Sequence, residues 1–218
     1  MDLTSRVGSL ILTLVAFAVR IKYLRQRGGI LKTIGVTLLI WVLAGSVGAK
    51  SIDNADRVSA SREVAASFMA ALKTELLKAM KEGGPVHAIS VCRDKAPEIA
   101  AAKTKETGFK VGRTGLRVRN LKNSPDAWEK NVMAAFESRK AEGEDVRQLE
   151  HWDVVSGNGT RVFRYMKAIP TGGLCLRCHG VKLHSSVENT LKNLYPQDRA
   201  TGFTTGDIRG AFTISQPM

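Results

Sequence analysis

The stretch WDVVSGNGTRVFRYMKA, residues 152–168, decides the fold that we predict for this chain of 218 residues. Runs rich in β-branched and aromatic residues, 152–155 and 161–168, flank the glycine-containing segment 156–159. Two such runs on either side of a glycine-rich turn are typical of a β-hairpin. Antiparallel strands are therefore predicted in the second half of the chain.

Helical patterns precede this hairpin. Apolar side chains recur at helical spacing over residues 62–81, and the Gly-Gly-Pro run 83–85 ends that helix. A second helix is predicted over 86–104, with a kink or break near Arg93 because Pro97 lies inside it. Two helices thus lead into the rest of the domain.

The remaining elements are shorter. Ser124 and Pro125 predict the start of a third helix, with Ser124 as its cap and Pro125 at the first helical position. The pattern also predicts a strand over 109–118, a short helix over 188–194 and a last strand over 210–214. Helices followed by antiparallel strands give an α+β domain.

Directly after the hairpin comes Cys175-Leu176-Arg177-Cys178-His179. A C-x-x-C-H run is the attachment signal of a c-type haem, in which Cys175 and Cys178 form thioether bonds and His179 is an axial ligand. A zinc site would need a second ligand pair at a compatible spacing, and the sequence has none. A redox C-x-x-C pair expects a thioredoxin-like strand-to-helix context, which residues 170–173 do not suggest. We therefore predict one covalently attached haem c.

Covalent haem attachment takes place outside the cytoplasm, and the N-terminus predicts export. The apolar run 34–44 follows basic residues and precedes the small residues 46–49, as in a signal peptide. A second apolar run, 9–19, is short for a membrane span of roughly 20 residues. We predict a signal peptide or membrane anchor over 1–49, a linker over 50–58 and a domain over 59–218. The predicted location is extracytoplasmic, in the periplasm or its equivalent, either soluble or anchored in the membrane through the N-terminus.

The net charge of the whole chain is +13, from 33 basic and 20 acidic residues. Removing 1–49, with six basic residues and one acidic residue, leaves 27 basic and 19 acidic residues, or +8. The basic residues are interleaved with acids and lack the aromatic pattern of a nucleic-acid module, so no nucleic-acid partner is predicted. An acidic redox partner protein and two haem propionates account for the excess.

In small cytochromes c a methionine after the C-x-x-C-H run completes the coordination of the iron. Here the only methionine after the run is Met218, so we expect the sixth ligand from upstream. Cys92 is the one cysteine outside the motif, and it lies on the apolar face of the second predicted helix. A buried free cysteine is common in proteins, so the residue chemistry alone leaves the choice open. The alternatives are His87, His151, His184, Met69, Met80, Met133 and Met166.

Five blocks in order resemble a known family. They are Val91-Cys92 to Ala100, Gly112-Arg113-Thr114 to Glu129, Ile169-Pro170 to Gly180, Leu194-Tyr195-Pro196 to Gly202, and Gly206-Asp207 to Ala211. Together they are similar to the single-haem c-type cytochromes with a PAS-like fold, which include a cyanobacterial lumenal cytochrome and the ectodomains of bacterial sensors. Gly115 and Leu121 depart from the pattern, where Ser and Pro are common.

The resemblance implies a PAS-like antiparallel sheet flanked by N-terminal helices. It also implies that His179 is one axial ligand and that Cys92 is the other. Arg113, Arg117 and Arg119 alternate along the strand predicted over 109–118, so they share a face. Arg113 and Arg119 are our candidates for binding the haem propionates, since arginine forms bidentate contacts with carboxylates. Asp207 and Arg209 are close enough in sequence to form a structural ion pair.

An anionic thiolate ligand stabilises ferric iron and lowers its potential. We therefore predict an exported haem protein with His/Cys ligation that functions in low-potential electron transfer or redox sensing. The alternative is a sensor of a diatomic gas such as NO, in which Cys92 is displaced from the iron. No enzyme is predicted, because a peroxidase needs an open iron position, which this chain would have only if Cys92 left.

Overall fold

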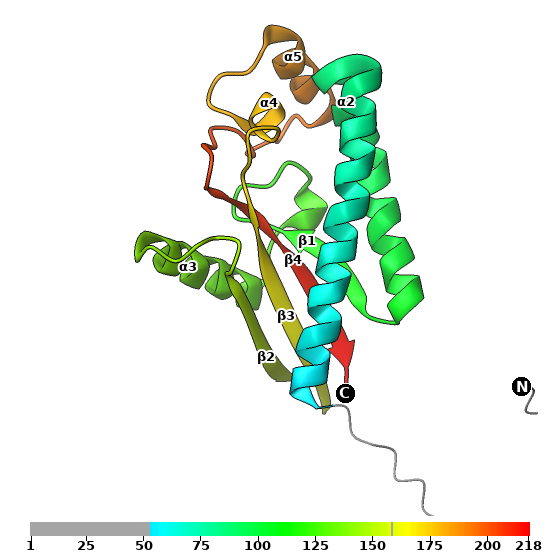
Figure 1. The fold of residues 1–218 in the computed structure, drawn as a ribbon, viewed down its shortest axis with the longest axis vertical. Helices are drawn as coiled ribbons and strands as arrows, with labels where there is room; N and C mark the ends of the chain where they lie inside the picture. Colours follow the sequence, from blue (N-terminus) through cyan, green and yellow to red (C-terminus); the bar gives the residue numbers. More distant parts are fainter. Residues whose placement is uncertain (1–52, 158) are drawn as a thin grey trace, which may run out of the picture. The chain divides into compact units, whose positions relative to one another are not determined.

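The computed structural model describes residues 53–157 and 159–218 (Figure 1). The predicted signal peptide or anchor over 1–49 and the start of the predicted linker lie outside the described residues. Within those residues, no helix combines the length and the apolar character that a membrane crossing requires.

Among the described residues, the first element is the long helix α2, Asn54–Thr107, which folds back on itself (Figure 1). Its dihedral angles leave the helical region only at Gly83 and at Gly84, where φ is +66°. Glycine adopts this left-handed conformation without the steric cost that a Cβ atom adds. The predicted end of the first helix at residues 83–85 is therefore confirmed as the point where the chain reverses.

Two details of α2 differ from the sequence prediction. The helix begins at Asn54, so residues 54–58 of the predicted linker are helical. We predicted a kink or a break near Arg93; a break was wrong, since the helix continues through Pro97. Ala96 is buried, and Ile99 packs against the core. Packing of this face offsets the hydrogen bond that proline cannot make.

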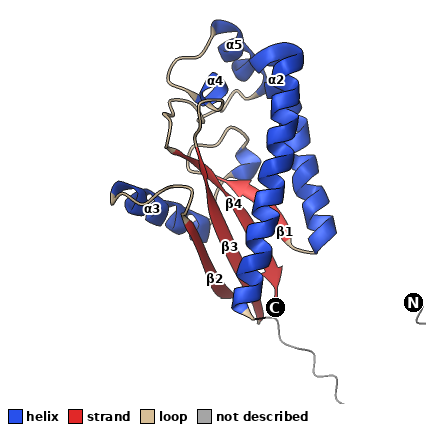
Figure 2. Ribbon diagram, in the orientation of Figure 1, coloured by secondary structure: helices blue, strands red, loops and turns tan. Residues whose placement is uncertain are grey.

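Four antiparallel strands form one sheet in the order β1-β4-β3-β2 (Figure 2). The predicted hairpin is confirmed as β2, Glu150–Gly157, and β3, Thr160–Pro170. The last strand, β4, Ile208–Pro217, is longer than predicted, and β1, Lys110–Thr114, is shorter. The α+β class with an antiparallel sheet and N-terminal helices is thus confirmed.

The two faces of the sheet bury different clusters. Phe163 and Tyr165 of β3 face α2, where they pack with Phe68 and other core residues. Met166 and Ala168 face the opposite side, against helix α3, Ala127–Ala141. This alternation is the two-residue period of a strand that is covered on both faces.

The N-cap of helix α3 lies two residues after the predicted cap, Ser124. Asp126 is its N-cap, and the Asp126 carboxylate accepts a hydrogen bond from the Glu129 amide at 2.9 Å. Glu129 in turn accepts from the Asp126 amide, which completes a capping box. The carboxylate three residues ahead of Glu129 therefore decides where the helix starts.

The connection between β3 and β4 contains two short helices at one end of the sheet, beside the turn of α2 (Figure 1). They are α4, Leu176–His179, and α5, Ser185–Leu194. Ile89 of α2 forms a small buried cluster with Val187 and Leu191 of α5, and Cys178 packs against it. This cluster fixes the C-x-x-C-H turn against the second half of α2.

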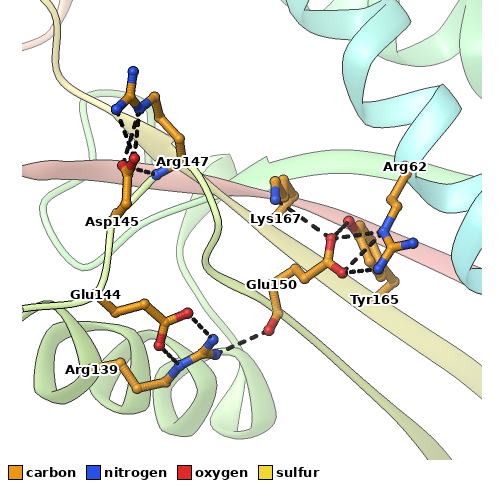
Figure 3. Close-up of polar contacts among 8 residues, drawn as sticks. All are labelled: Arg62, Arg139, Glu144, Asp145, Arg147, Glu150, Tyr165 and Lys167. Atoms are coloured by element: carbon orange, nitrogen blue, oxygen red, sulfur yellow. Dashed lines mark hydrogen bonds and ion pairs between the residues drawn. The ribbon is translucent and has the colours of Figure 1, made fainter.

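A polar network ties the first half of α2 to the sheet (Figure 3). Glu150 of β2 accepts a hydrogen bond from the Tyr165 hydroxyl at 2.7 Å and forms ion pairs with Arg62 and Lys167. These contacts lower the pKa of Glu150 from its ordinary value of 4.5 to about 2, with the Arg62 hydrogen bond as the largest cause. Glu150 is therefore ionised at neutral pH.

Candidate functional site

The C-x-x-C-H residues form a single helical turn. The amides of Cys178 and His179 both donate to the Cys175 carbonyl, at 3.2 and 2.9 Å. Residues three apart on a helical turn lie on the same side, so the turn presents Cys175 and Cys178 together. Both thiols are free and partly buried, and burial raises the pKa of Cys178.

The imidazole of His179 is held by its Nδ1 atom, which lies 2.6 Å from the Ala200 carbonyl oxygen. That contact requires a proton on Nδ1, so Nε2 carries the free lone pair. The ring of Phe203 lies edge-on to the imidazole, with 6.2 Å between centroids. Burial, followed by the charges of Arg209 and Arg119, lowers the pKa of His179 well below its usual value. His179 is therefore a neutral imidazole with one nitrogen available to bind a metal ion.

Cys92 lies on the second half of α2, close to this turn. After burial, which is the largest cause, the charge of Arg119 lowers the pKa of Cys178 and the charge of Cys92 raises it. Burial raises the pKa of Cys92 itself, while the nearby charges of Arg113 and Arg119 oppose that effect. The structure thus brings all three cysteines to the same end of the molecule.

Three arginines surround His179. Arg119 pairs with Asp198, with 3.0 Å between Nε and Oδ2. Arg113 and Arg209 form no ion pair among residues 53–157 and 159–218, and the buried Nε of Arg209 has no hydrogen-bond partner there. Burial, then the charges of Arg119 and Arg113, lowers the pKa of Arg209 to about 10. One carboxylate among three guanidinium groups leaves two positive charges uncompensated.

The family model Tll0287-like matches residues 49–217. The chain belongs to the Tll0287-like family. It is similar to a solved structure described as the cyanobacterial haem protein Tll0287, with 21% sequence identity and a TM-score of 0.54. That match covers 76% of this chain and 94% of the other chain. A comparison with curated proteins finds no match.

Membership of the Tll0287-like family confirms the resemblance described from the sequence, and the solved structure shows the same fold. Among the described residues, no group of three or more His, Cys, Asp or Glu side chains is arranged to hold a metal ion. An iron that is held by a porphyrin needs only two protein ligands, so a haem does not require such a group.

In this Tll0287-like chain, the other histidines predicted as possible sixth ligands contact nearby polar side chains, and the methionines lie in the core or on α2. Three have imidazole contacts: His87 with Glu82 at 3.6 Å, His151 with Asp153 at 2.9 Å, and His184 with Ser186 at 2.8 Å. Met133 and Met166 are buried on the α3 side of the sheet, Met69 packs against the α2-side core, and Met80 is half-buried on α2.

Two expectations about charged residues were wrong. Arg113, Arg117 and Arg119 do not share a strand face, because β1 ends at Thr114. Arg117 instead stacks over Phe203, with its Cζ atom 3.6 Å from the ring centroid. Chain geometry beyond the strand, which residue spacing does not report, decides where these side chains point.

The suggested pair of Asp207 and Arg209 is also absent. Asp207 pairs with Lys140 at 2.8 Å and accepts a hydrogen bond from the Thr204 amide. Arg209 instead lies over the Phe203 ring, with its Cζ atom 5.3 Å from the centroid, and donates to the Arg117 carbonyl at 3.4 Å. Its charge helps to lower the pKa of His179, after burial as the largest cause, so the sequence prediction missed a residue of the site. The signal that could have found it is the β1–β4 register, which brings the start of β4 beside the end of β1.

Proposed function

We propose that this chain is a haem protein that carries one haem c, held covalently by Cys175 and Cys178. His179 and Cys92 are the axial ligands in this proposal. The haem would supply an iron that changes its oxidation state. The chain's own residues hold it, orient its ligands and set the surrounding charge.

The observation that carries this proposal is the presentation of His179. Its Nδ1 atom is fixed by the Ala200 carbonyl at 2.6 Å, in the same turn that presents two free thiols. Histidines that bind metals typically donate their second N–H to a carbonyl or carboxylate, which fixes the ring and raises its basicity. A C-x-x-C-H turn with this contact is ready to bind haem iron through Nε2.

The charge of the site also fits a haem. Two propionates carry two negative charges, and the arginine cluster has two uncompensated positive charges. Arg113 and Arg209 are the residues that would hold these carboxylates, since neither forms an ion pair among the described residues. The unpartnered Nε of Arg209 is a donor that a carboxylate oxygen would satisfy.

Thiolate ligation favours electron transfer at low potential or redox sensing. An anionic ligand stabilises the ferric state, and Arg113 and Arg119 stabilise a negative charge on Cys92. The second candidate function is sensing of a diatomic gas such as NO, with release of Cys92. It is favoured by the placement of the two ligands, because Cys92 is on the helical hairpin α2 and His179 is on α4, in the separate connection between β3 and β4.

We propose an acidic protein as the redox partner. In residues 171–203 the exposed charges are four basic side chains and Glu188, while Asp198 is paired with Arg119. Such a surface attracts an acidic protein at a rate that falls as the salt concentration rises. The basic residues are Arg177, Lys182, Lys192 and Arg199.

Function of this kind belongs in an extracytoplasmic compartment, where haem c is attached. Export through residues 1–49, with or without anchoring to the membrane, is part of the proposal. Expression with and without these residues, followed by fractionation, tests it. Haem c should appear only when the segment is present.

The proposed ligation is tested by low-temperature EPR and optical spectra of the ferric protein and of Cys92→Ser. We expect a low-spin thiolate signal that is lost in Cys92→Ser. His87→Ala is the matched control, because His87 lies five residues before Cys92 on the same helix and is exposed. Its spectrum should equal that of the wild type.

Other results would change the conclusion. A thiolate signal that persists in Cys92→Ser would exclude Cys92 as a ligand. A five-coordinate, high-spin wild type would favour gas binding or peroxide chemistry. Haem that is removed by acid and organic solvent would show that Cys175 and Cys178 do not hold it covalently.

A further inference from the structure

A network of hydrogen bonds links Arg119 and Asp198 to the backbone beside His179. The Arg119 side chain is only 12% exposed and that of Asp198 only 9%. One Nη atom of Arg119 donates to the Cys178 carbonyl at 2.6 Å and to the Ala200 carbonyl at 3.3 Å, while its Nε pairs with Asp198. The guanidinium group therefore binds the residue before His179 and the residue to which the imidazole bonds.

Both the amide and the carbonyl group of Ala200 are hydrogen-bonded. Its amide donates to Asp198 Oδ1 at 2.7 Å, and its carbonyl accepts from Arg119 and from Nδ1 of His179. The neighbouring backbone adds one more link, since the Arg199 amide donates to the Val118 carbonyl at 2.9 Å. The position of the Ala200 oxygen, and with it the plane of the imidazole, is thus set by the Arg119–Asp198 pair.

We propose that Arg119 and Asp198 are positioning residues that set the orientation of His179 and the strength of its bond to iron. In this proposal Arg119 positions His179 and does not serve the propionates, because its Nε and one Nη atom are directed to Asp198 and to two carbonyl groups. This inference rests on the proposed function, in which His179 is an axial ligand.

The pair acts on the iron in a predictable direction. A guanidinium beside the Ala200 oxygen withdraws electron density from it, so the carbonyl is a weaker acceptor for the Nδ1 proton. A weaker hydrogen bond at Nδ1 makes the imidazole a weaker donor to iron, which disfavours the ferric state. The positive charge of Arg119 disfavours ferric iron as well, and the negative charge of Asp198 opposes that effect.

The two residues should therefore shift the reduction potential in opposite directions. Arg119→Gln should lower the midpoint potential, because the positive charge is lost and the Ala200 carbonyl becomes a stronger acceptor. Asp198→Asn should raise it, because Arg119 is left without its counter-ion in a buried position. The double variant should lie between the two single variants.

The experiment is a redox titration of the full chain in its haem-bound form, with ferric EPR of each variant. Arg199→Gln is the matched control, since it removes one exposed arginine next to Ala200 whose side chain has no hydrogen bond or ion pair among the described residues. Its midpoint potential should remain close to that of the wild type. Shifts of equal sign in Arg119→Gln and Asp198→Asn, or shifts no larger than that of the control, would overturn the proposal.

Arg119→Lys covers the case in which Arg119→Gln does not fold. Lysine keeps the charge but lacks the planar fork that reaches three acceptors. We expect a midpoint potential between those of the wild type and of Arg119→Gln, because the charge is kept while the contact with the Ala200 carbonyl is lost, together with altered EPR g values and faster hydrogen exchange at the Ala200 amide. Unchanged g values and exchange in Arg119→Lys would overturn the positioning role.

Failure of this inference is distinguishable from failure of the proposed function. The Cys92→Ser spectra report on the ligand set, whereas the variant potentials report on the surroundings of His179. A wild type with the thiolate signature and equal-sign shifts would retain the function and reject the positioning role.

Discussion

Replacing Glu150 by Gln should make the protein less stable at neutral pH and should remove part of its sensitivity to acid. Glu150 joins Arg62 of α2 to Tyr165 and Lys167 of β3 (Figure 3). These contacts hold the pKa of Glu150 near 2, below its ordinary value of 4.5. A carboxylate with a lowered pKa in the folded state contributes stability wherever it is ionised.

The size of the effect follows from the pKa. Each pKa unit is worth about 1.4 kcal/mol, so lowering the pKa from 4.5 to about 2 corresponds to about 3 kcal/mol before screening. The Arg62 side chain is 58% exposed and that of Glu150 is 20% exposed, so water screens the pair. We therefore expect Glu150→Gln to reduce the free energy of unfolding by about 1–2 kcal/mol at neutral pH.

The lowered pKa also decides how the contribution of Glu150 to the free energy of unfolding varies with pH. The contribution of Glu150 is fully present above pH 4.5 and is lost as the pH falls from 4.5 toward 2. Urea unfolding of the wild type and of Glu150→Gln, followed by far-UV circular dichroism across this range, measures it. The difference between the two proteins should shrink toward zero as the pH approaches 2.

Glu144→Gln is the matched control for this experiment. Among residues 53–157 and 159–218, Glu144 pairs with Arg139 alone, at a more exposed site of the same region (Figure 3). The control should leave the unfolding free energy unchanged within error. A Glu150→Gln difference that does not vary with pH, or one that Glu144→Gln reproduces, would refute the argument from the network.

Two further predictions concern packing. Phe68→Ala should lower the free energy of unfolding by about 3–5 kcal/mol, because the fully buried ring would leave a cavity. Leu77→Ala on the same helix, 47% exposed, is its control and should cost under about 0.5 kcal/mol in urea unfolding. Gly210→Ala should separate β1 from β4, since a Cβ atom would lie 2.4 Å from the Thr114 carbonyl oxygen, at a φ of +158°. We expect a loss of about 1–3 kcal/mol in urea unfolding, whereas Gly173→Ala, with open space around it, should behave like the wild type; equal stabilities would contradict the clash.

Local patterns predicted much of the fold. The hairpin of β2 and β3 and the end of the first helix at Gly83 and Gly84 depend on neighbouring residues, and both are present as expected. Pro97 misled the prediction, because packing of the helix against the core outweighs one missing hydrogen bond. Such a balance depends on tertiary contacts that a sequence pattern does not contain.

The candidate site was predictable to a different degree for each residue. The spacing of the C-x-x-C-H run requires no knowledge of the fold. The roles of Arg119 and Arg209 do, since they depend on how the loop after β1 crosses residues 198–203 and on the β1–β4 register. The sequence does not distinguish the two arginines. In the structure Arg119 bonds to Asp198 and to two backbone carbonyls, whereas the buried Nε of Arg209 has no hydrogen-bond partner among the described residues.

The reversal of α2 at Gly83 and Gly84 has a consequence for how this protein assembles. It places Cys92 on a helical hairpin whose two halves are adjacent in the sequence, whereas His179 is in the connection between β3 and β4, whose pairing brings together distant segments. Local structure generally forms faster than long-range strand pairing. With the proposed ligand set, the sulfur–iron bond forms only once the hairpin has docked onto the finished sheet. Stopped-flow absorbance of the refolding protein would then record that docking as a separate kinetic phase, seen as the appearance of the absorbance band of the thiolate-ligated haem.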